Sequence, residues 1–186
     1  MVKRILAMAV VAGLAMSFAS WAADAPKAAA PKDTYVGATK CKMCHMKQYK
    51  AWAETMHAKA FEGLKATTPE QLKKMNELFK AAVKEKPETD EACVGCHVTG
   101  HKDPSGYPQK DEVKNAALAF VGCEVCHGPG SKHMAVPMSD KEGRKKSILT
   151  ATAETCAKCH GTITPKFDFA EMSKKVHPVA VAAPAK

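Results

Sequence analysis

The chain has 186 residues, a formal charge of +9 and 46% hydrophobic residues, which suits one or two folded domains and excludes wholesale disorder. Only 6% of its residues are aromatic, so large side chains alone would build a thin core. We therefore expect that something other than side chains fills part of the interior.

The first 22 residues have the layout of a secretory signal peptide. Met1-Val2-Lys3-Arg4 is a short basic start, residues 5–19 form an apolar run, and Ser20-Trp21-Ala22 offers small residues where a signal peptidase reads. The run is shorter than the roughly 20 residues that a membrane-spanning helix needs, and no later segment is apolar enough to span a bilayer. We expect cleavage after Ala22 and export to the periplasm without a membrane span, with onward passage to the cell surface left open.

Two segments rich in Ala, Pro and Lys flank the part that we expect to fold. Residues 23–32 are typical of a flexible leader, and residues 178–186 are typical of a disordered tail. The folded domain is therefore expected to span residues 33–177.

Three segments carry helix signals. Apolar side chains recur at three- and four-residue steps over residues 47–64, which predicts one amphipathic helix. Thr68-Pro69-Glu70-Gln71 is a capping box with Pro at the first helical position, and it predicts a helix that runs to about Lys84. Asp168 is a plausible N-cap for a last helix that ends at Val176, before Pro178.

All eight cysteines fall in four C-x-x-C-H units, the attachment signature of c-type haem. Two cysteines one helical turn apart reach the two vinyl groups of one porphyrin, and the adjacent His becomes the proximal iron ligand. Disulfides and zinc sites also use paired cysteines, but neither requires a His after every second Cys. The sequence therefore predicts four c-type haems, with thioethers from Cys41, Cys44, Cys93, Cys96, Cys123, Cys126, Cys156 and Cys159 and proximal ligands His45, His97, His127 and His160.

Four haems would change the charge of the exported chain. Loss of Lys3 and Arg4 with the signal peptide takes +9 to +7. Eight ionised propionates and four ferric cores would bring the total to about +3 oxidised and about −1 reduced. The basic composition is therefore a poor guide to partners, and a nucleic-acid partner is not expected.

The four remaining histidines are candidate distal ligands. His57 lies on the apolar arc of the predicted helix over residues 47–64, where an iron is the favoured partner. His133 follows a Gly-Pro-Gly turn that directs the chain away from its own haem, so it either reaches a neighbouring haem or binds none. His177 ends the last predicted helix, where a surface histidine is the alternative. His101 lies in a polar, turn-rich loop four residues after His97 and is expected not to bind iron.

At these residues the chain resembles the tetrahaem cytochrome c-554 family. The matching stretches include Lys40-Cys-Lys-Met-Cys-His45, Thr55-Met-His57-Ala-Lys-Ala60, Val121-Gly-Cys-Glu-Val-Cys-His-Gly-Pro-Gly130 and residues 167–172. The resemblance implies a mostly α fold of short helices and long loops, with little or no sheet, wrapped around four closely packed haems.

The resemblance also implies which irons have an axial histidine on both faces. It makes His57, His133 and His177 the distal ligands of three low-spin haems, and it leaves the haem on Cys93, Cys96 and His97 five-coordinate and high-spin. His101 is a departure, because family members more often carry an apolar or aromatic residue there. The alternative that all four haems have two axial histidines, with His101 as the fourth distal ligand, is therefore kept.

The leading hypothesis for function is electron transfer between redox-partner proteins, whose identities the sequence does not give. Axial histidines on both faces close an iron to substrates, and no Ser/His/Asp or paired-carboxylate arrangement is identifiable, so an enzyme is not the first interpretation. The second hypothesis is an enzyme that binds nitric oxide, nitrite or hydroxylamine at the open second haem; nitric oxide reduction has been proposed for the resembled family. The third is a subunit of a conductive filament built from stacked haems.

Overall fold

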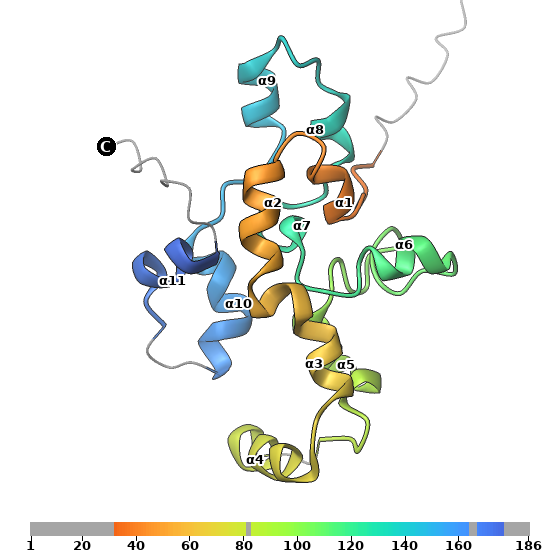
Figure 1. The fold of residues 1–186 in the computed structure, drawn as a ribbon, viewed down its shortest axis with the longest axis vertical. Coiled ribbons are helices and arrows are strands. Elements are labelled where there is room, and N and C mark those ends of the chain that lie inside the picture. Colours follow the sequence, from red (N-terminus) through yellow and green to blue (C-terminus); the bar gives the residue numbers. More distant parts are fainter. Residues whose placement is uncertain (1–31, 81–82, 164–166, 177–186) are drawn as a thin grey trace, which may run out of the picture. The chain divides into compact units, whose positions relative to one another are not determined.

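The computed structural model describes residues 32–80, 83–163 and 167–176, and within these residues the chain is helical and forms no strand (Figure 1). The prediction of a mostly α fold is confirmed. The predicted signal peptide, residues 23–31 of the leader, His177 and the tail lie outside the described residues. The helices are α1 (Ala38–Cys41), α2 (Met46–Ala53), η1 (Met56–Lys59), α3 (Ala60–Lys65), α4 (Pro69–Phe79), η2 (Pro87–Thr89), α5 (Glu91–His97), α6 (Glu112–Ala116), α7 (Cys123–His127), α8 (Ser131–Ala135), α9 (Lys141–Lys146), α10 (Ala153–Ile163) and α11 (Phe169–Val176).

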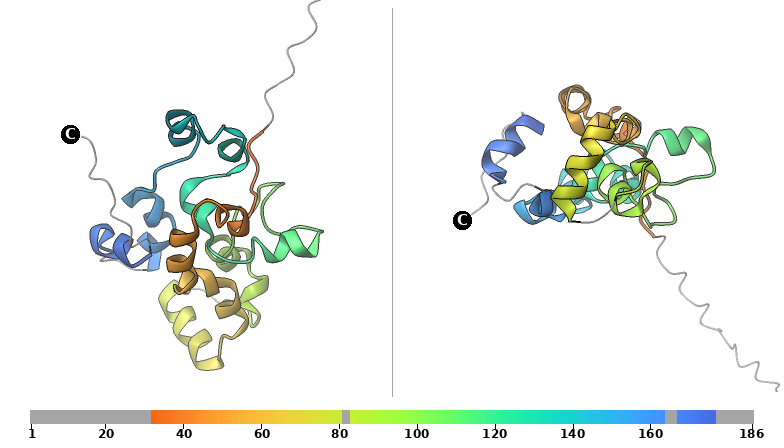
Figure 2. Two further views of the ribbon diagram at one scale, coloured as in Figure 1. Left: turned by 45° about the horizontal axis from the view of Figure 1, so that its top comes forward. Right: turned by 90° about the horizontal axis from the view of Figure 1, so that it is seen from below.

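The single helix predicted over residues 47–64 is wrong, because the chain breaks it into α2, η1 and α3. The break lies at Thr55, whose backbone is extended (ψ 162°) and whose hydroxyl donates to the Trp52 carbonyl at 2.7 Å. Figures 1 and 2 show the resulting bend between α2 and α3. The two halves bury different groups, since the Trp52 indole donates to the Val121 carbonyl while Phe61 packs against α5. Met56, expected on the apolar face, is exposed.

The other two helix signals are confirmed, with one difference in length. Thr68 and Gln71 form the reciprocal capping box that begins α4, but this helix ends at Phe79 rather than near Lys84. It ends there because Lys80 adopts a left-handed backbone (φ 50°), which cannot continue a helix. At α11 the Asp168 carboxylate accepts from the Glu171 amide at 3.1 Å.

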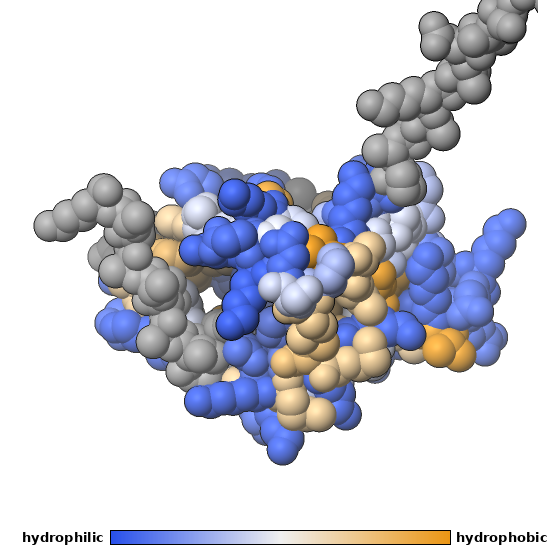
Figure 3. All heavy atoms as spheres, turned by 90° about the horizontal axis from the view of Figure 1, so that it is seen from above, coloured by the Kyte–Doolittle hydropathy of each residue, from blue (hydrophilic) through white to orange (hydrophobic). Residues whose placement is uncertain are grey.

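The apolar core is small, as the composition predicts. One cluster joins α3 to α5 through Phe61, Leu64, Val94 and Val98, against which Cys93, Tyr107 and Ala119 pack. Elsewhere apolar residues reach the surface between hydrophilic ones, as one face shows in Figure 3. The large exposed apolar side chains include five methionines, at positions 43, 46, 56, 134 and 138. Side-chain packing alone therefore leaves much apolar surface without a partner among the described residues.

The stretch between the second and third motifs is held by a buried threonine. The Thr99 hydroxyl donates to the Phe120 carbonyl at 2.7 Å and accepts from the Gly122 amide at 3.0 Å. Thr99 is almost fully buried, and Gly122 immediately precedes α7. This pair of hydrogen bonds ties the chain after His97 to the start of the third motif.

No helix in the described part of the chain is long and apolar enough to cross a membrane.

Candidate haem attachment sites

Each C-x-x-C-H motif lies on a helical turn, which gives its two sulfurs the spacing that the sequence requires. The second, third and fourth motifs lie within α5, α7 and α10. The first begins at Cys41, the last residue of α1, and the His45 amide donates back to the Cys41 carbonyl at 2.9 Å. All eight cysteines are free thiols. The cysteines are therefore available in pairs for thioether bonds.

The motifs converge on one another through their sulfurs. The Cys41 thiol hydrogen-bonds to Cys123, which raises the pKa of Cys41 and lowers that of Cys123. In the same way burial and a hydrogen bond with Cys96 raise the pKa of Cys159 to about 12. The first motif therefore lies beside the third, and the second beside the fourth.

Backbone carbonyls fix the orientation of three imidazole rings. The Nδ1 atoms of His97, His127 and His133 lie 2.8 Å from the Ala60 carbonyl, 2.9 Å from the Leu149 carbonyl and 2.9 Å from the Arg144 carbonyl, respectively. A carbonyl oxygen only accepts, so Nδ1 is the protonated nitrogen in each ring. The lone pair then lies on Nε2, the tautomer in which a histidine ligates a metal through Nε2 with Nδ1 held by an outer hydrogen bond.

Two of the predicted proximal histidines lie close to two of the predicted distal ones. The ring centroids of His45 and His133 are 6.2 Å apart, and those of His57 and His160 are 5.9 Å apart. A metal bound midway at about 2 Å from each ring nitrogen separates two imidazole centroids by about 6 Å. Rotation of either ring about the line through the metal leaves that distance unchanged, so interplanar angles of 29° and 63° both fit.

The surroundings of His45 and His57 favour the neutral imidazole, which is the form that binds metal. Burial, together with the neighbouring His133, Arg144 and His127, lowers the pKa of His45. Burial, together with His160 and His97, lowers the pKa of His57. One group would compete for a ligand position: the Arg144 guanidinium lies 3.3 Å from Nε2 of His133 and would have to release that nitrogen for an iron to bind there.

His101 is buried at its two ring nitrogens, and neither has a hydrogen-bond partner in the structure. Its ring lies against Gly95, where a Cβ atom would meet Cδ2 at 3.6 Å. Gly95 belongs to α5, the helix of the second motif, so His101 lies beside the motif that carries His97. Two unsatisfied buried nitrogens are unusual in a native chain and indicate a polar partner outside the protein.

The residues fit a haem at each motif. The thiols are paired and free, and two pairs of imidazoles have the separation of axial ligands. Between residues 32 and 176, excluding the undescribed gaps, no three His, Cys, Asp or Glu side chains converge on one point. His177 lies outside the described residues, so its predicted role stays a prediction.

Sequence reasoning did not single out the groups that hold the histidines. Carbonyls of Ala60, Leu149 and Arg144 orient the rings, and a carbonyl carries no sequence signal. Glu124, inside the third motif, is a second omission: its carboxylate is buried and accepts three backbone N–H groups. The available signal for a special role of Glu124 was its position between Cys123 and Val125, because this places a carboxylate within a predicted haem attachment motif.

Three comparisons with known proteins show what this chain is similar to. Residues 40–128 match the family model described as cytochrome c554 and c-prime. Cytochrome c-554 from Nitrosomonas europaea is 35% identical over 159 residues, which cover 85% of this chain. The chain spans 56% of the length of that curated relative. The solved structure of reduced cytochrome c554 from Nitrosomonas europaea matches with a TM-score of 0.60 and 29% identity, covering 79% of this chain and 85% of that one.

Proposed function

Because the chain belongs to the cytochrome c554 family, we propose that it is an exported tetrahaem cytochrome that carries electrons between redox-partner proteins in the periplasm. When bound, each haem supplies a one-electron Fe(III)/Fe(II) couple whose potential depends on its axial ligands, burial and hydrogen bonds. Eight cysteines in four motifs provide covalent attachment for four haems.

The facing of His45 with His133, and of His57 with His160, carries this proposal. We assign each pair as the two axial ligands of one iron. Carbonyl acceptors at Nδ1 hold His133 in the tautomer that ligates through Nε2. An iron with a histidine on each face has no open position for a substrate, which suits a carrier. The resemblance to the family adds His177 as a third distal ligand.

The convergence of the motifs supports passage of electrons through the chain. The sulfurs of the first and third motifs are hydrogen-bonded to each other, as are those of the second and fourth. Burial and the nearby Cys156 raise the pKa of Cys126 to about 11, so the third motif also lies near the fourth. The protein thus brings its four attachment points together in the order first, third, fourth, second.

A second candidate function is binding or reduction of nitric oxide at the iron held by His97. The position of His101 favours it, because its ring packs against Gly95 in the helix of the second motif itself. A histidine placed beside its own motif is poorly positioned to reach the opposite haem face. We therefore assign His97 as the single axial ligand of the second haem.

Electron paramagnetic resonance (EPR) of the oxidised protein tests both proposals. We expect four haems per chain and low-spin ferric signals from three of them, with one high-spin signal altered by nitric oxide. His133→Ala and His57→Ala should each convert one low-spin haem to high-spin, whereas His101→Ala is the matched control and should convert none. Low-spin signals that survive the first two substitutions would refute the ligand pairs. A new high-spin signal in His101→Ala would place His101 on the iron.

Turnover separates the carrier from the enzyme. A carrier reduced with stoichiometric dithionite should hold four electrons and pass them to an external acceptor without consuming nitric oxide. Consumption of nitric oxide by the reduced protein over many turnovers would favour the enzyme over the electron carrier. Light scattering tests the third hypothesis, since a filament would give particles much larger than one 19.9 kDa chain.

A further inference from the structure

Glu124 is the one carboxylate that is buried within a haem attachment motif. It is the second residue of the third motif, and only 3% of its surface is exposed. Oε1 accepts from the Val36 amide at 2.9 Å and from the Gly130 amide at 2.8 Å, and Oε2 accepts from the Gly37 amide at 2.7 Å. Three donors converging on two oxygens are the environment of an ionised carboxylate, which only accepts.

The three amides belong to two segments that lead to His45 and His133. Val36 and Gly37 immediately precede α1, whose last residue is Cys41 of the first motif. Gly130 immediately precedes α8, which carries His133. The imidazoles at the far ends of these two segments face each other at 6.2 Å. One side chain thus holds the starting points of both halves of an axial pair.

The turn that meets Glu124 has little room to move. A Cβ atom on Gly130 would lie 3.2 Å from Oε1 of Glu124 and 3.2 Å from Cγ2 of Val36. Gly37 has a positive φ of 85°, a conformation that residues with a side chain rarely adopt, and its Cβ would lie 3.0 Å from that of Ala117. Close packing around the carboxylate means that a change in its length or charge passes to the backbone on both sides.

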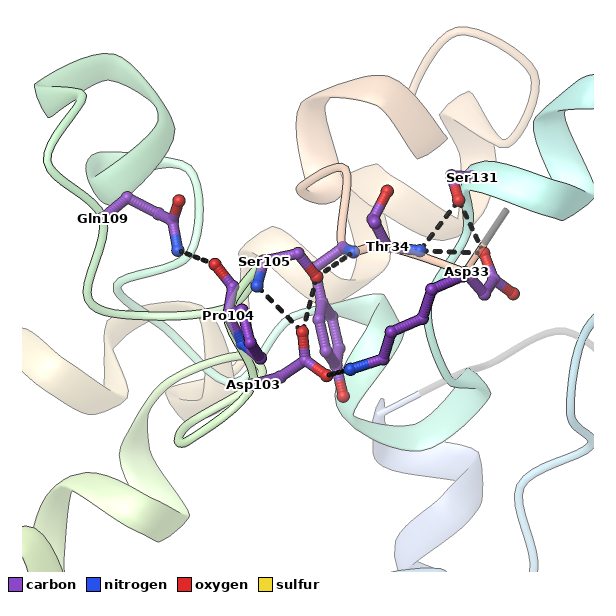
Figure 4. Close-up of polar contacts among 9 residues, drawn as sticks. Asp33, Thr34, Asp103, Pro104, Ser105, Gln109 and Ser131 are labelled. Carbon is purple, nitrogen blue, oxygen red and sulfur yellow. Dashed lines mark hydrogen bonds and ion pairs between the residues drawn. The ribbon is translucent and has the colours of Figure 1, made fainter. Parts of the chain in front are cut away.

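A second, more exposed group of hydrogen bonds joins the same two segments (Figure 4). The Asp33 carboxylate accepts from the Ser131 hydroxyl at 2.7 Å and from the Lys132 amide at 2.9 Å. The Thr34 amide donates to the Ser131 hydroxyl at 2.8 Å. This outer group keeps the segments together if the inner one is disturbed, so a change at Glu124 should alter geometry without unfolding the region.

We propose that Glu124 is a positioning residue, which sets the spacing between His45 and His133 and lowers the reduction potential of the haem that they hold. The proposal rests on the assignment of His45 and His133 as axial ligands made above. A fixed negative charge in a poorly solvated interior favours the ferric state over the ferrous state of a neighbouring haem, because the oxidised form carries one more positive charge. Burial raises the pKa of Glu124, whereas the hydrogen bonds from the Val36, Gly37 and Gly130 amides oppose that rise and favour the ionised carboxylate.

Glu124→Gln in the haem-loaded protein tests the charge and one of the hydrogen bonds. The variant has the same volume, but its NH₂ group cannot accept from the amide that it faces. We expect four haems, a changed low-spin EPR signal for one haem, and a positive shift of the potential of one or two haems in a spectroelectrochemical titration. Glu85→Gln removes the same charge from an exposed position and is the matched control. It should leave both readouts unchanged.

Gly130→Ala separates position from charge. The added Cβ presses on Oε1 of Glu124 and on Val36 while the carboxylate stays ionised. We expect a changed EPR signal of the same haem without the positive shift in potential. EPR signals that match the unmodified protein in both variants would overturn the positioning role, and unchanged potentials in Glu124→Gln would overturn the electrostatic one. If His133→Ala leaves all low-spin signals intact, the assignment of His133 as an axial ligand has failed. If His133→Ala removes a low-spin signal but Glu124→Gln changes neither the EPR signals nor the potentials, only the proposal for Glu124 has failed.

Discussion

The chain holds its second motif and its first and third motifs in different ways. Around the second motif, α3 and α5 bury an apolar cluster of Phe61, Leu64, Val94 and Val98. Around the first and third motifs the close contacts are hydrogen bonds, from backbone amides to Glu124 and from Ser131 to Asp33. Apolar packing is non-directional and fills space, whereas hydrogen bonds fix distances and angles.

This difference between apolar packing and hydrogen bonds corresponds to the histidines that lie in each region. Near the first motif the imidazoles of His45 and His133 lie 6.2 Å apart, and we propose that they are an axial pair, which small errors in spacing would strain. Near the second motif His97 is held by one carbonyl, and the His101 ring lies against Gly95 of the same helix. The comparison teaches that a small protein with a thin core can support one attachment motif by apolar packing and others by directional hydrogen bonds.

The largest expected effect comes from removing one haem from each region in turn. Cys41→Ala with Cys44→Ala, and separately Cys93→Ala with Cys96→Ala, should each leave three haems instead of four, measured by haem absorbance and mass. The second motif retains the apolar cluster of α3 and α5, so its variant should unfold at the higher temperature in circular dichroism. Equal melting temperatures would show that the apolar cluster does not support its region without the haem.

The next effect tests the apolar cluster directly. Leu64 is 3% exposed, and Leu64→Ala should cost about 2–5 kcal/mol of unfolding free energy, because it removes transfer energy and leaves a cavity. Chemical denaturation measures the loss. Leu78→Ala is the matched control, since Leu78 is 56% exposed, and should stay within about 0.5 kcal/mol of the unmodified protein. Similar losses at both positions would contradict the view that α3 and α5 form the apolar support.

A smaller effect concerns the connection between the two regions. Thr99→Val should cost about 1–3 kcal/mol, because the Phe120 carbonyl and the Gly122 amide lose their buried partner. Denaturation of the haem-loaded protein gives the value. Thr67→Val is the control, since the Thr67 hydroxyl makes an exposed 3.3 Å contact, and it should change stability little. An unaffected Thr99→Val protein would mean that the regions are held together by their haems alone.

The smallest effect is a dependence on pH in the polar region. Burial opposes ionisation of Asp33, but hydrogen bonds from Lys132, Ser131 and Thr34 outweigh it and lower its pKa below 3.8. A lowered folded-state pKa stabilises the protein above the unfolded-state pKa and loses that contribution as the pH falls through the folded-state value. Asp33→Asn should therefore be less stable than the unmodified protein at pH 7, and the difference should shrink below about pH 4. A difference that is constant from pH 7 to pH 3 would contradict this origin.

Part of the fold was predictable because its signals are local. The capping box at Thr68 and the N-cap at Asp168 act on amides three residues away, so both helix starts follow from neighbouring residues. The break at Thr55 was not predictable from periodicity. Trp52 and Phe61 bury against different partners, Val121 and α5, and only their tertiary contacts show that one straight helix cannot satisfy both.

The sequence by itself determined the cofactor class and the number of haems, and it predicts their proximal ligands. Thioether attachment and proximal ligation use residues within one helical turn, so five consecutive positions are sufficient to specify them. Only the tertiary structure decided which imidazoles lie close together and which backbone amides the buried Glu124 carboxylate accepts from. His133 meets His45, and Glu124 meets Val36, across segments that are distant in the chain, and spacing in the sequence does not encode a distance between elements that fold separately.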